Sequence, residues 1–203
     1  MLKFSVSDPI KITPYDPQWP QVFNHLKQDL ERLWGDWAER IDHIGSTAVP
    51  GLAAKNVIDI QITVKSLENP DFNMFLEKRA EHSPVYTLLP YNRDELSGFK
   101  DNHPGLKKRF IKALSAEFTA NIHIRQAGNI NQRYALLFVA FLKEHPAQRE
   151  IYSLLKQRLA NLFPESIAGY LHIKDPLMDL LYLQAEAWAE YTGWKGDWEN
   201  QNA

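Results

Sequence analysis

His43-Ile44-Gly45-Ser46-Thr47-Ala48-Val49-Pro50-Gly51-Leu52 form a turn-rich segment that leads into Val57-Ile58-Asp59-Ile60-Gln61-Ile62-Thr63-Val64. A glycine–serine turn lets the backbone approach a ligand closely, and its N–H groups and hydroxyl can bind a phosphate oxygen. The carboxylate of Asp59 can hold Mg²⁺, a hard cation that prefers oxygen ligands. Together these two features describe half of a site for phosphoryl or nucleotidyl transfer.

The same residues also fit a tight turn before a strand whose aspartate lies on a solvated face. The segment is not a P-loop, because no Gly-Lys-Ser/Thr follows at the required spacing. It is not the Gly-x-Ser-x-Gly elbow of serine hydrolases either, since Ser46 is followed by Thr-Ala-Val. The turn and its strand therefore leave both a phosphate site and a purely structural role open.

Residues 57–64 alternate between two faces and are rich in β-branched side chains, which predicts a strand. Asp59, Gln61 and Thr63 share one face, and isoleucine and valine side chains occupy the other. We therefore expect an apolar core on one side of this strand and the polar site on the other.

A long amphipathic helix is predicted before the turn, over residues 17–38, with Asp16 as N-cap and Pro17 as the first helical residue. Gly35 can end this helix early. Its apolar stripe, which we interpret as core packing, comprises Val22, Phe23, Leu26, Leu30, Leu33, Trp34 and Trp37.

After the strand, the pattern predicts a short helix over 70–80, a turn-rich region over 84–106 and two strands over 107–113 and 116–124. This succession of strands and helices indicates an α/β or α+β architecture. The residues that share the polar face of the last strand are Glu117, Thr119, Asn121 and His123.

The rest of the chain is helical. A buried helix is predicted over 131–144, an amphipathic helix over 147–161, and a last helix capped by Asp175 and begun by Pro176. The side chains expected inside are Ile151, Leu154, Leu155 and Leu159 in the second helix, and Leu177, Leu180, Leu181, Ala185, Trp188 and Ala189 in the third.

We expect two parts in one continuous unit: an α/β core over 1–127 and a helical part over 128–203 that packs on it. No flexible linker separates them, so we expect a shared core. The length of 203 residues fits this arrangement, because single domains commonly contain about 100–200 residues.

The composition narrows the class of protein. The net charge of −2 excludes a protein that is basic overall, and the aromatic residues are not interleaved with basic ones, so we expect no nucleic-acid partner. Without cysteine the chain has no disulfide, Cys-ligated zinc, iron–sulfur cluster or thiol nucleophile. No apolar window of about 18 residues predicts a membrane span, and residues 1–9 have no signal-peptide pattern, so we expect a cytoplasmic protein.

A locally basic segment covers residues 100–112, where Lys100, Lys107, Lys108, Arg109 and Lys112 stand against the single acid Asp101. On a strand, Lys107 and Arg109 face one way while Lys108 and Lys112 face the other. One of these pairs can neutralise a polyphosphate in a cleft. The alternative is a solvated edge strand whose lysines oppose aggregation.

Several stretches resemble the GrpB family of nucleotidyltransferase-like proteins, over residues 10–194 of this chain. The resemblance is carried by Pro-Tyr-Asp-Pro-Gln-Trp-Pro (14–20), His-Ile-Gly-Ser-Thr-Ala-Val-Pro-Gly-Leu (43–52), Ala-Lys-Asn-Val-Ile-Asp-Ile (54–60), Asn-Ile-His-Ile (121–124), Phe-Leu-Lys-Glu-His-Pro (141–146) and Ala-Trp-Ala-Glu-Tyr-Thr-Gly-Trp (187–194). It implies a nucleotidyltransferase-like fold, with a small mixed sheet backed by helices and a helical C-terminal extension.

In that superfamily, a Gly-Ser turn precedes a strand that carries two carboxylates in an Asp-x-Asp/Glu pattern. Gly45 and Ser46 match the turn, and Asp59 matches the first carboxylate. Gln61 stands where the second carboxylate is expected, and its amide oxygen has no charge. Carboxylates in a two-metal site offset the charge of the cations, so this departure weakens the expected site.

The superfamily places a third carboxylate on a later strand. Here that strand offers Asn121 and His123, while Glu117 shares their face two or three residues too early. His123 can be a metal or phosphate ligand, or a structural histidine. Arg109 and Lys174 match basic positions of the family, so the resemblance implies that they contact phosphate.

These observations leave three hypotheses. The first is an enzyme that transfers a nucleotidyl group from a nucleoside triphosphate, with Asp59 and Ser46 as catalytic residues. The second is a non-catalytic module that binds a nucleotide or other phosphorylated small molecule. The third is an accessory protein linked to coenzyme A metabolism, because some GrpB relatives are fused to dephospho-CoA kinase. The residues expected to bind phosphate are Gly45, Ser46, Thr47, Arg109 and Lys174, and those expected to hold Mg²⁺ are Asp59, Gln61 and His123.

Overall fold

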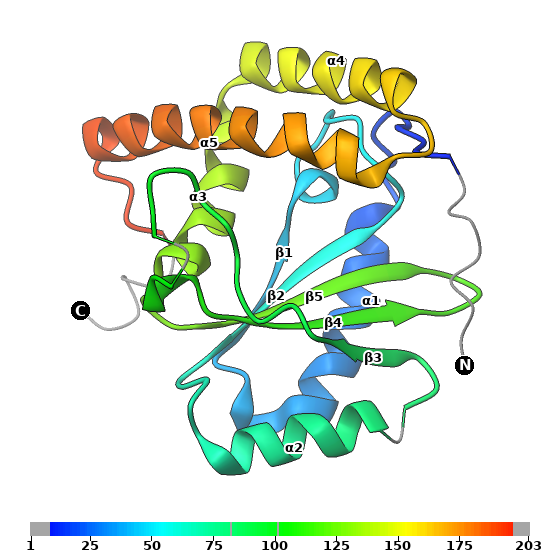
Figure 1. Cartoon of the computed structure of the whole chain (residues 1–203), viewed down its shortest axis with the longest axis vertical. Helices are drawn as coiled ribbons and strands as arrows, with labels where there is room; N and C mark the ends of the chain where they lie inside the picture. Colours follow the sequence, from blue (N-terminus) through cyan, green and yellow to red (C-terminus); the bar gives the residue numbers. More distant parts are fainter. Residues whose placement is uncertain (1–8, 82, 101, 197–203) are drawn as a thin grey trace.

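The structure is a computed structural model that describes residues 9–81, 83–100 and 102–196 (Figure 1). The signal-peptide expectation at residues 1–8 and the acid Asp101 of the basic segment lie outside the described residues. The helices are α1 (Trp19–Trp34), α2 (Pro70–Glu81), α3 (Ile130–Glu144), α4 (Pro146–Leu162) and α5 (Ile167–Thr192), and the strands are β1 (Arg40–Ile44), β2 (Ile58–Val64), β3 (Tyr86–Leu89), β4 (Arg109–Leu114) and β5 (Thr119–Gln126). Short 3₁₀ turns cover Gly35–Trp37 (η1), Ser46–Ala48 (η2) and Pro104–Leu106 (η3).

A five-stranded mixed sheet with the order β1-β2-β5-β4-β3 forms the centre of the molecule. The central pair β2–β5 is parallel, and the other three pairs are antiparallel. The parallel register places Asp59 beside Asn121 and Gln61 beside His123. This architecture confirms the expected α+β class, and it makes neighbours of two polar strand faces that are far apart in the sequence.

Helices α1 and α2 cover one face of the sheet (Figure 1). Alternate strand residues point into this layer because successive strand side chains face opposite sides. The buried strand residues of this core are Ile41 of β1, Ile58, Ile60, Ile62 and Val64 of β2, Ile111 and Ala113 of β4, and Ala120, Ile122 and Ile124 of β5. The intervening residues of the same strands face the other way, toward the C-terminal helices.

Helices α3, α4 and α5 pack together above the other face, with α4 and α5 side by side in Figure 1. Their core includes Val49 and Leu52 from the segment that follows the Gly-Ser turn, so this segment contacts the helical layer. None of the helices in the described ranges is both long and apolar enough to cross a membrane.

The N-terminal helix is shorter than its sequence pattern predicts. Asp16 Oδ1 accepts a hydrogen bond from the Gln18 N–H at 2.8 Å, in a turn before the helix, and α1 begins at Trp19. Its first-turn proline is therefore Pro20 rather than Pro17. At the other end, Gly35 ends the helix, as its position in the pattern allows.

Three further details differ from the prediction. A short edge strand, β3, lies in the region expected to consist of turns, and it pairs with β4. Of the stripe expected inside α4, Leu159 is buried and Leu155 is half-buried, but Ile151 and Leu154 are exposed, and the helix buries Tyr152, Lys156 and Ala160 as well. Leu180 of α5, also expected inside, is exposed. Helix α5 begins at Ile167, where the Ser166 side chain accepts from the Gly169 N–H, so the expected start at Asp175 and Pro176 is wrong. Pro176 lies inside this helix, because the preceding turns of α5 and their packing outweigh the loss of one hydrogen bond.

Candidate functional site

A cleft of about 540 Å³ lies between the polar face of the sheet and the C-terminal helices. Its floor is formed by β2 and β5, one end by the Gly-Ser turn, and its walls by α3, α4 and α5. The residues that line it include Gly45, Ser46, Lys55, Asp59, Asp94, Lys108, Asn121, His123, Arg125, Tyr134, Phe138, Tyr152, Lys156, Tyr170, Lys174 and Asp175. Its size is in the usual range for a site that binds a small molecule.

The Gly-Ser turn packs directly on the first strand carboxylate. Gly45 has a φ of +69°, and a β-carbon there would lie 2.5 Å from Asp59 Oδ2. Only glycine combines this backbone conformation with the available space. The turn therefore brings Ser46 to the same end of the cleft as Asp59.

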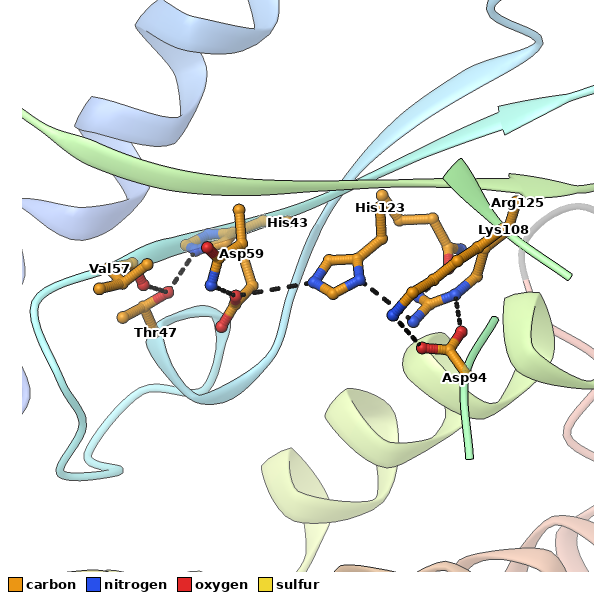
Figure 2. Close-up of polar contacts among 10 residues, drawn as sticks. His43, Thr47, Val57, Asp59, Asp94, Lys108, His123 and Arg125 are labelled. Carbon is orange, nitrogen blue, oxygen red and sulfur yellow. Dashed lines mark hydrogen bonds and ion pairs between the residues drawn. The ribbon is translucent and has the colours of Figure 1, made fainter. Parts of the chain in front are cut away.

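Hydrogen bonds of Thr47 and His43 stabilise the Gly-Ser turn (Figure 2). The Thr47 hydroxyl donates to the Val57 carbonyl at 3.4 Å and lies 2.9 Å from His43 Nε2. The His43 ring stacks on Phe23, and its burial lowers the pKa of His43 to about 4. Thr47 is only 1% exposed, and these two contacts of its hydroxyl stabilise the turn.

Asp59 keeps its charge although it lies deep in the cleft. Burial raises the pKa of its carboxyl, but the nearby His123 imidazole and the Asn121 amide together hold the pKa below its usual value. Asn121 Nδ2 donates to Asp59 Oδ1 at 2.9 Å, and His123 Nε2 lies 3.9 Å from the same oxygen. Asp59 Oδ2 instead faces Gly45 and the turn.

A second polar cluster occupies the other end of the cleft (Figure 2). Asp94 Oδ1 accepts from Lys108 at 2.5 Å, and Asp94 Oδ2 accepts from Arg125 Nε at 2.9 Å. These two cations hold the pKa of Asp94 well below its usual value despite its burial. Arg125 Nη2 also lies 3.5 Å from His123 Nδ1, and burial together with the charges of Arg125 and Lys108 lowers the pKa of His123. His123 therefore connects the Asp59 end of the cleft to the Asp94 cluster.

The expected metal ligands do not fit a two-cation site. Gln61 is 0% exposed, and its Oε1 accepts from Arg125 Nη1 at 2.8 Å while its Nε2 donates to the Gln132 carbonyl. An oxygen that already accepts from a guanidinium is a poor ligand for Mg²⁺. Within residues 9–81, 83–100 and 102–196, no group of three carboxylates or histidines is placed to hold a metal ion. Asp59 therefore has no second carboxylate at position 61 to share a pair of cations.

Three lysines gather near the turn, and we call Lys55, Lys156 and Lys174 the lysine cluster. Lys156 Nζ donates to Ser46 Oγ at 2.9 Å. Lys55 and Lys174 lie over the ring of Tyr170, with Nζ 5.7 Å and 6.0 Å from its centroid. Burial lowers the pKa of Lys55, and the positive charge of Lys174 lowers it further. The turn thus faces a concentration of positive charge.

Arg109 does not line this cleft, contrary to the expectation. On β4 it lies on the same face as Ile111 and Ala113, which pack on α1 and α2. Its Nη2 donates a hydrogen bond to the side chain of Asn73 in α2 at 3.0 Å. Lys107 faces that side as well and pairs with Glu68, while Lys108 faces the cleft. The expected division of the basic residues between the two faces is therefore correct, but the cleft receives Lys108 rather than Arg109.

Sequence reasoning missed several residues of the cleft. Lys156 shares a helical stripe with Tyr152 and Leu159, a spacing that marks it as inward, but a lysine is rarely expected in a core. Lys55 lies four residues before Asp59, in the stretch that leads into the strand, and this proximity is a signal that could have found it. Asp94 comes from a loop whose position no local pattern predicts.

Comparisons with known proteins agree with this architecture. The family model described as GrpB protein matches residues 9–184. A dephospho-CoA kinase of Mycolicibacterium paratuberculosis is 35% identical over 199 residues, which cover 92% of this chain and 48% of that protein. The chain therefore spans about half the length of this curated relative.

Solved structures show the same kind of similarity. The crystal structure of the conserved protein GrpB from Enterococcus faecalis aligns with a TM-score of 0.67 and 28% identity, over 88% of this chain and 99% of that chain. A cytoplasmic RNA terminal U-transferase aligns with a TM-score of 0.44 and 18% identity, over 75% of this chain and 40% of that chain.

Proposed function

The chain belongs to the GrpB family, and we propose that its cleft binds a phosphorylated small molecule, such as a nucleotide, with the phosphate at the lysine cluster and the Gly-Ser turn. The observation that carries this proposal is the uncompensated positive charge. Within the described residues, no carboxylate forms an ion pair with Lys55, and Lys174 pairs only with Asp175 at 3.0 Å. Buried cations are costly unless they are paired, so an anionic ligand would stabilise this arrangement.

The turn supplies further donors. In the part of the chain that the structure describes, the backbone N–H groups of Ser46 and Thr47 have no backbone acceptor. Backbone N–H groups in such turns commonly bind phosphate oxygens. They complement the charge of the lysine cluster with directional hydrogen bonds.

The remainder of the ligand would lie along the aromatic wall formed by Tyr134, Phe138 and Tyr152. Aromatic side chains suit a planar base or another partly apolar group. The related dephospho-CoA kinase adds coenzyme A and dephospho-coenzyme A to the ligands worth testing, beside the nucleoside triphosphates. A volume of about 540 Å³ is large enough for part or all of such ligands.

Binding is a better fit to this geometry than transfer assisted by two Mg²⁺ ions. Gln61 stands where a second carboxylate would be, and Arg125 already uses its oxygen. The positive charge next to a bound phosphate would come from Lys55 and Lys174. We therefore expect ligand affinity to be the same in EDTA and in Mg²⁺.

The test is calorimetric titration with ATP, GTP, CTP, UTP, coenzyme A, dephospho-coenzyme A and pyrophosphate, each with Mg²⁺ and with EDTA. For the ligand that binds, Lys55→Met and Lys174→Met should each weaken affinity about tenfold or more, because a charge-assisted hydrogen bond contributes about 1.5–3 kcal/mol. Arg109→Ala is the matched control, since it removes a cation from the opposite face of the sheet. The affinity of this variant for the ligand should stay within about twofold of that of the parent protein. No binding by any of these ligands, or an equal loss in Arg109→Ala, would contradict the proposal.

A further inference from the structure

Ser46 and Lys156 form a pair that phosphate binding alone does not require. The Lys156 amine lies 2.9 Å from Ser46 Oγ, and the two residues are 110 positions apart in the chain. Lys156 is only 3% exposed, yet both residues line the cleft. A hydroxyl in an accessible cleft is therefore hydrogen-bonded to a buried amine.

The surroundings of Lys156 favour its neutral form. Its Nζ lies 4.5 Å from the centroid of the Tyr152 ring, and burial is the main reason that the pKa of Lys156 is lowered to about 7. The charges of Lys174 and Lys55 lower this pKa further, and Asp59 opposes them. A neutral amine can accept the proton of the hydroxyl beside it, which is how a weak oxygen nucleophile is activated.

Ser46 is distinguished from the other serines that make hydrogen bonds in the described ranges. The hydroxyls of Ser66, Ser83, Ser115 and Ser166 accept from backbone N–H groups a few residues away. Ser153 Oγ accepts from the Ala53 N–H. Ser46 has the Lys156 amine and the Tyr152 phenol as side-chain partners and lines an open cleft.

We propose that Ser46 and Lys156 act as a nucleophile and general base that take an acyl group from an ester or thioester of a phosphorylated carrier. The choice of a phosphorylated carrier rests on the proposed function, with Lys55 and Lys174 left to hold the phosphate. The acyl chemistry itself depends only on the pair.

The step balances without any further reactant. Ser46 Oγ bonds to the carbonyl carbon while its proton passes to Lys156 Nζ. The bond from that carbon to the carrier oxygen or sulfur then breaks, and the leaving group takes the proton from Lys156. Water releases the acid from Ser46 by the same proton path, which restores the hydroxyl and the neutral amine.

The experiment uses p-nitrophenyl acetate, a neutral activated ester, with the full chain at pH 8. We expect a burst of p-nitrophenolate and an acetyl group on the peptide that contains Ser46, removable by hydroxylamine as an ester is. Ser46→Ala should lose this label, and Lys156→Met and Lys156→Arg should slow its formation at least about 100-fold, since a general base commonly contributes about 10²–10⁴ in rate. Lys27→Met, which removes an exposed lysine of α1 outside the cleft, is the matched control and should react like the parent protein.

Lys156→Arg separates the base from the charge, because arginine stays protonated. An unchanged rate of acetylation in this variant, or an acetyl group found on Lys156 instead of Ser46, would contradict the roles of Ser46 as nucleophile and Lys156 as general base. If a Lys156 variant does not fold, the residue that carries the acetyl group in the parent protein still shows whether Ser46 is the nucleophile. Because the probe carries no phosphate, acylation of Ser46 without binding of any phosphorylated ligand would contradict only the proposed function. Ligand binding without acylation would contradict only this inference.

Discussion

A β-carbon on Gly45 would lie 2.5 Å from Asp59 Oδ2, closer than a carbon and an oxygen that are not bonded can approach. The turn that presents Ser46 to the cleft and the strand that presents Asp59 are therefore in direct contact. A shift of the turn away from Asp59 would also move Ser46 relative to Lys156, to which it is hydrogen-bonded.

Gly45→Ala should destabilise the protein by about 2–4 kcal/mol, because it combines a left-handed backbone with a steric clash. Gly98→Ala is the matched control: its φ is +87°, but a β-carbon there meets nothing within 4 Å, so only about 1–2 kcal/mol is expected. Urea unfolding of both variants measures the difference. Adding Asp59→Ala should recover part of the loss in Gly45→Ala, and equal costs for the two glycines would refute the clash.

Arg125→Met should destabilise the protein by about 3–5 kcal/mol, since it leaves the buried acceptors of Asp94 and Gln61 with one donor fewer. Arg32→Met, which breaks an exposed ion pair with Asp29 on α1, should cost less than about 1 kcal/mol. Thermal and urea unfolding report both values. In the double variant Asp94→Asn/Arg125→Met the two costs should not add, and simple additivity would show that the pair is not coupled.

His43 makes stability depend on pH in the acid range. Its pKa is about 4 in the folded protein, whereas an unperturbed histidine has a pKa of 6.5, so the unfolded chain binds more protons between these values. Stability should therefore fall as the pH decreases from about 6.5 to about 4, by on the order of 2–3 kcal/mol. His43→Gln removes the titrating group, and its unfolding free energy should change less over this window. Parallel pH profiles for the two proteins would argue against the assignment.

Pro176→Ala should stabilise the protein by about 1–3 kcal/mol. Pro176 lies inside α5, where it has no N–H to donate to the preceding turn, and alanine restores that hydrogen bond. For a chain of this size, each kcal/mol raises Tm by about 2–4 °C. Differential scanning calorimetry measures the change, and a lower Tm would mean that the proline is needed to direct α5 onto its neighbours.

Much of the architecture could be predicted from local patterns. The alternation in residues 57–64 identified β2 and its two faces, and the same alternation in β5 placed Asn121 and His123 on the face that borders Asp59. The side of the sheet on which Arg109 lies could also have been predicted, because strand side chains alternate and Arg109 falls on the same face as the apolar Ile111 and Ala113. The start of α5 was mispredicted because proline is a strong local signal for a first turn, whereas packing keeps Pro176 inside a longer helix.

The sequence by itself determined the α+β class, the polar strand face and the glycine-rich turn, because each depends on residues close together in the chain. Only the tertiary structure decided what surrounds that turn. Lys156 reaches Ser46 from a helix 110 positions away, and Arg125 and Gln61, separated by 64 positions, bind one another where a metal ligand was expected. Such contacts arise from the parallel pairing of β2 with β5 and from the docking of α3–α5. These long-range arrangements leave no periodic trace in the sequence, since burial of a whole layer, rather than any local preference, fixes them.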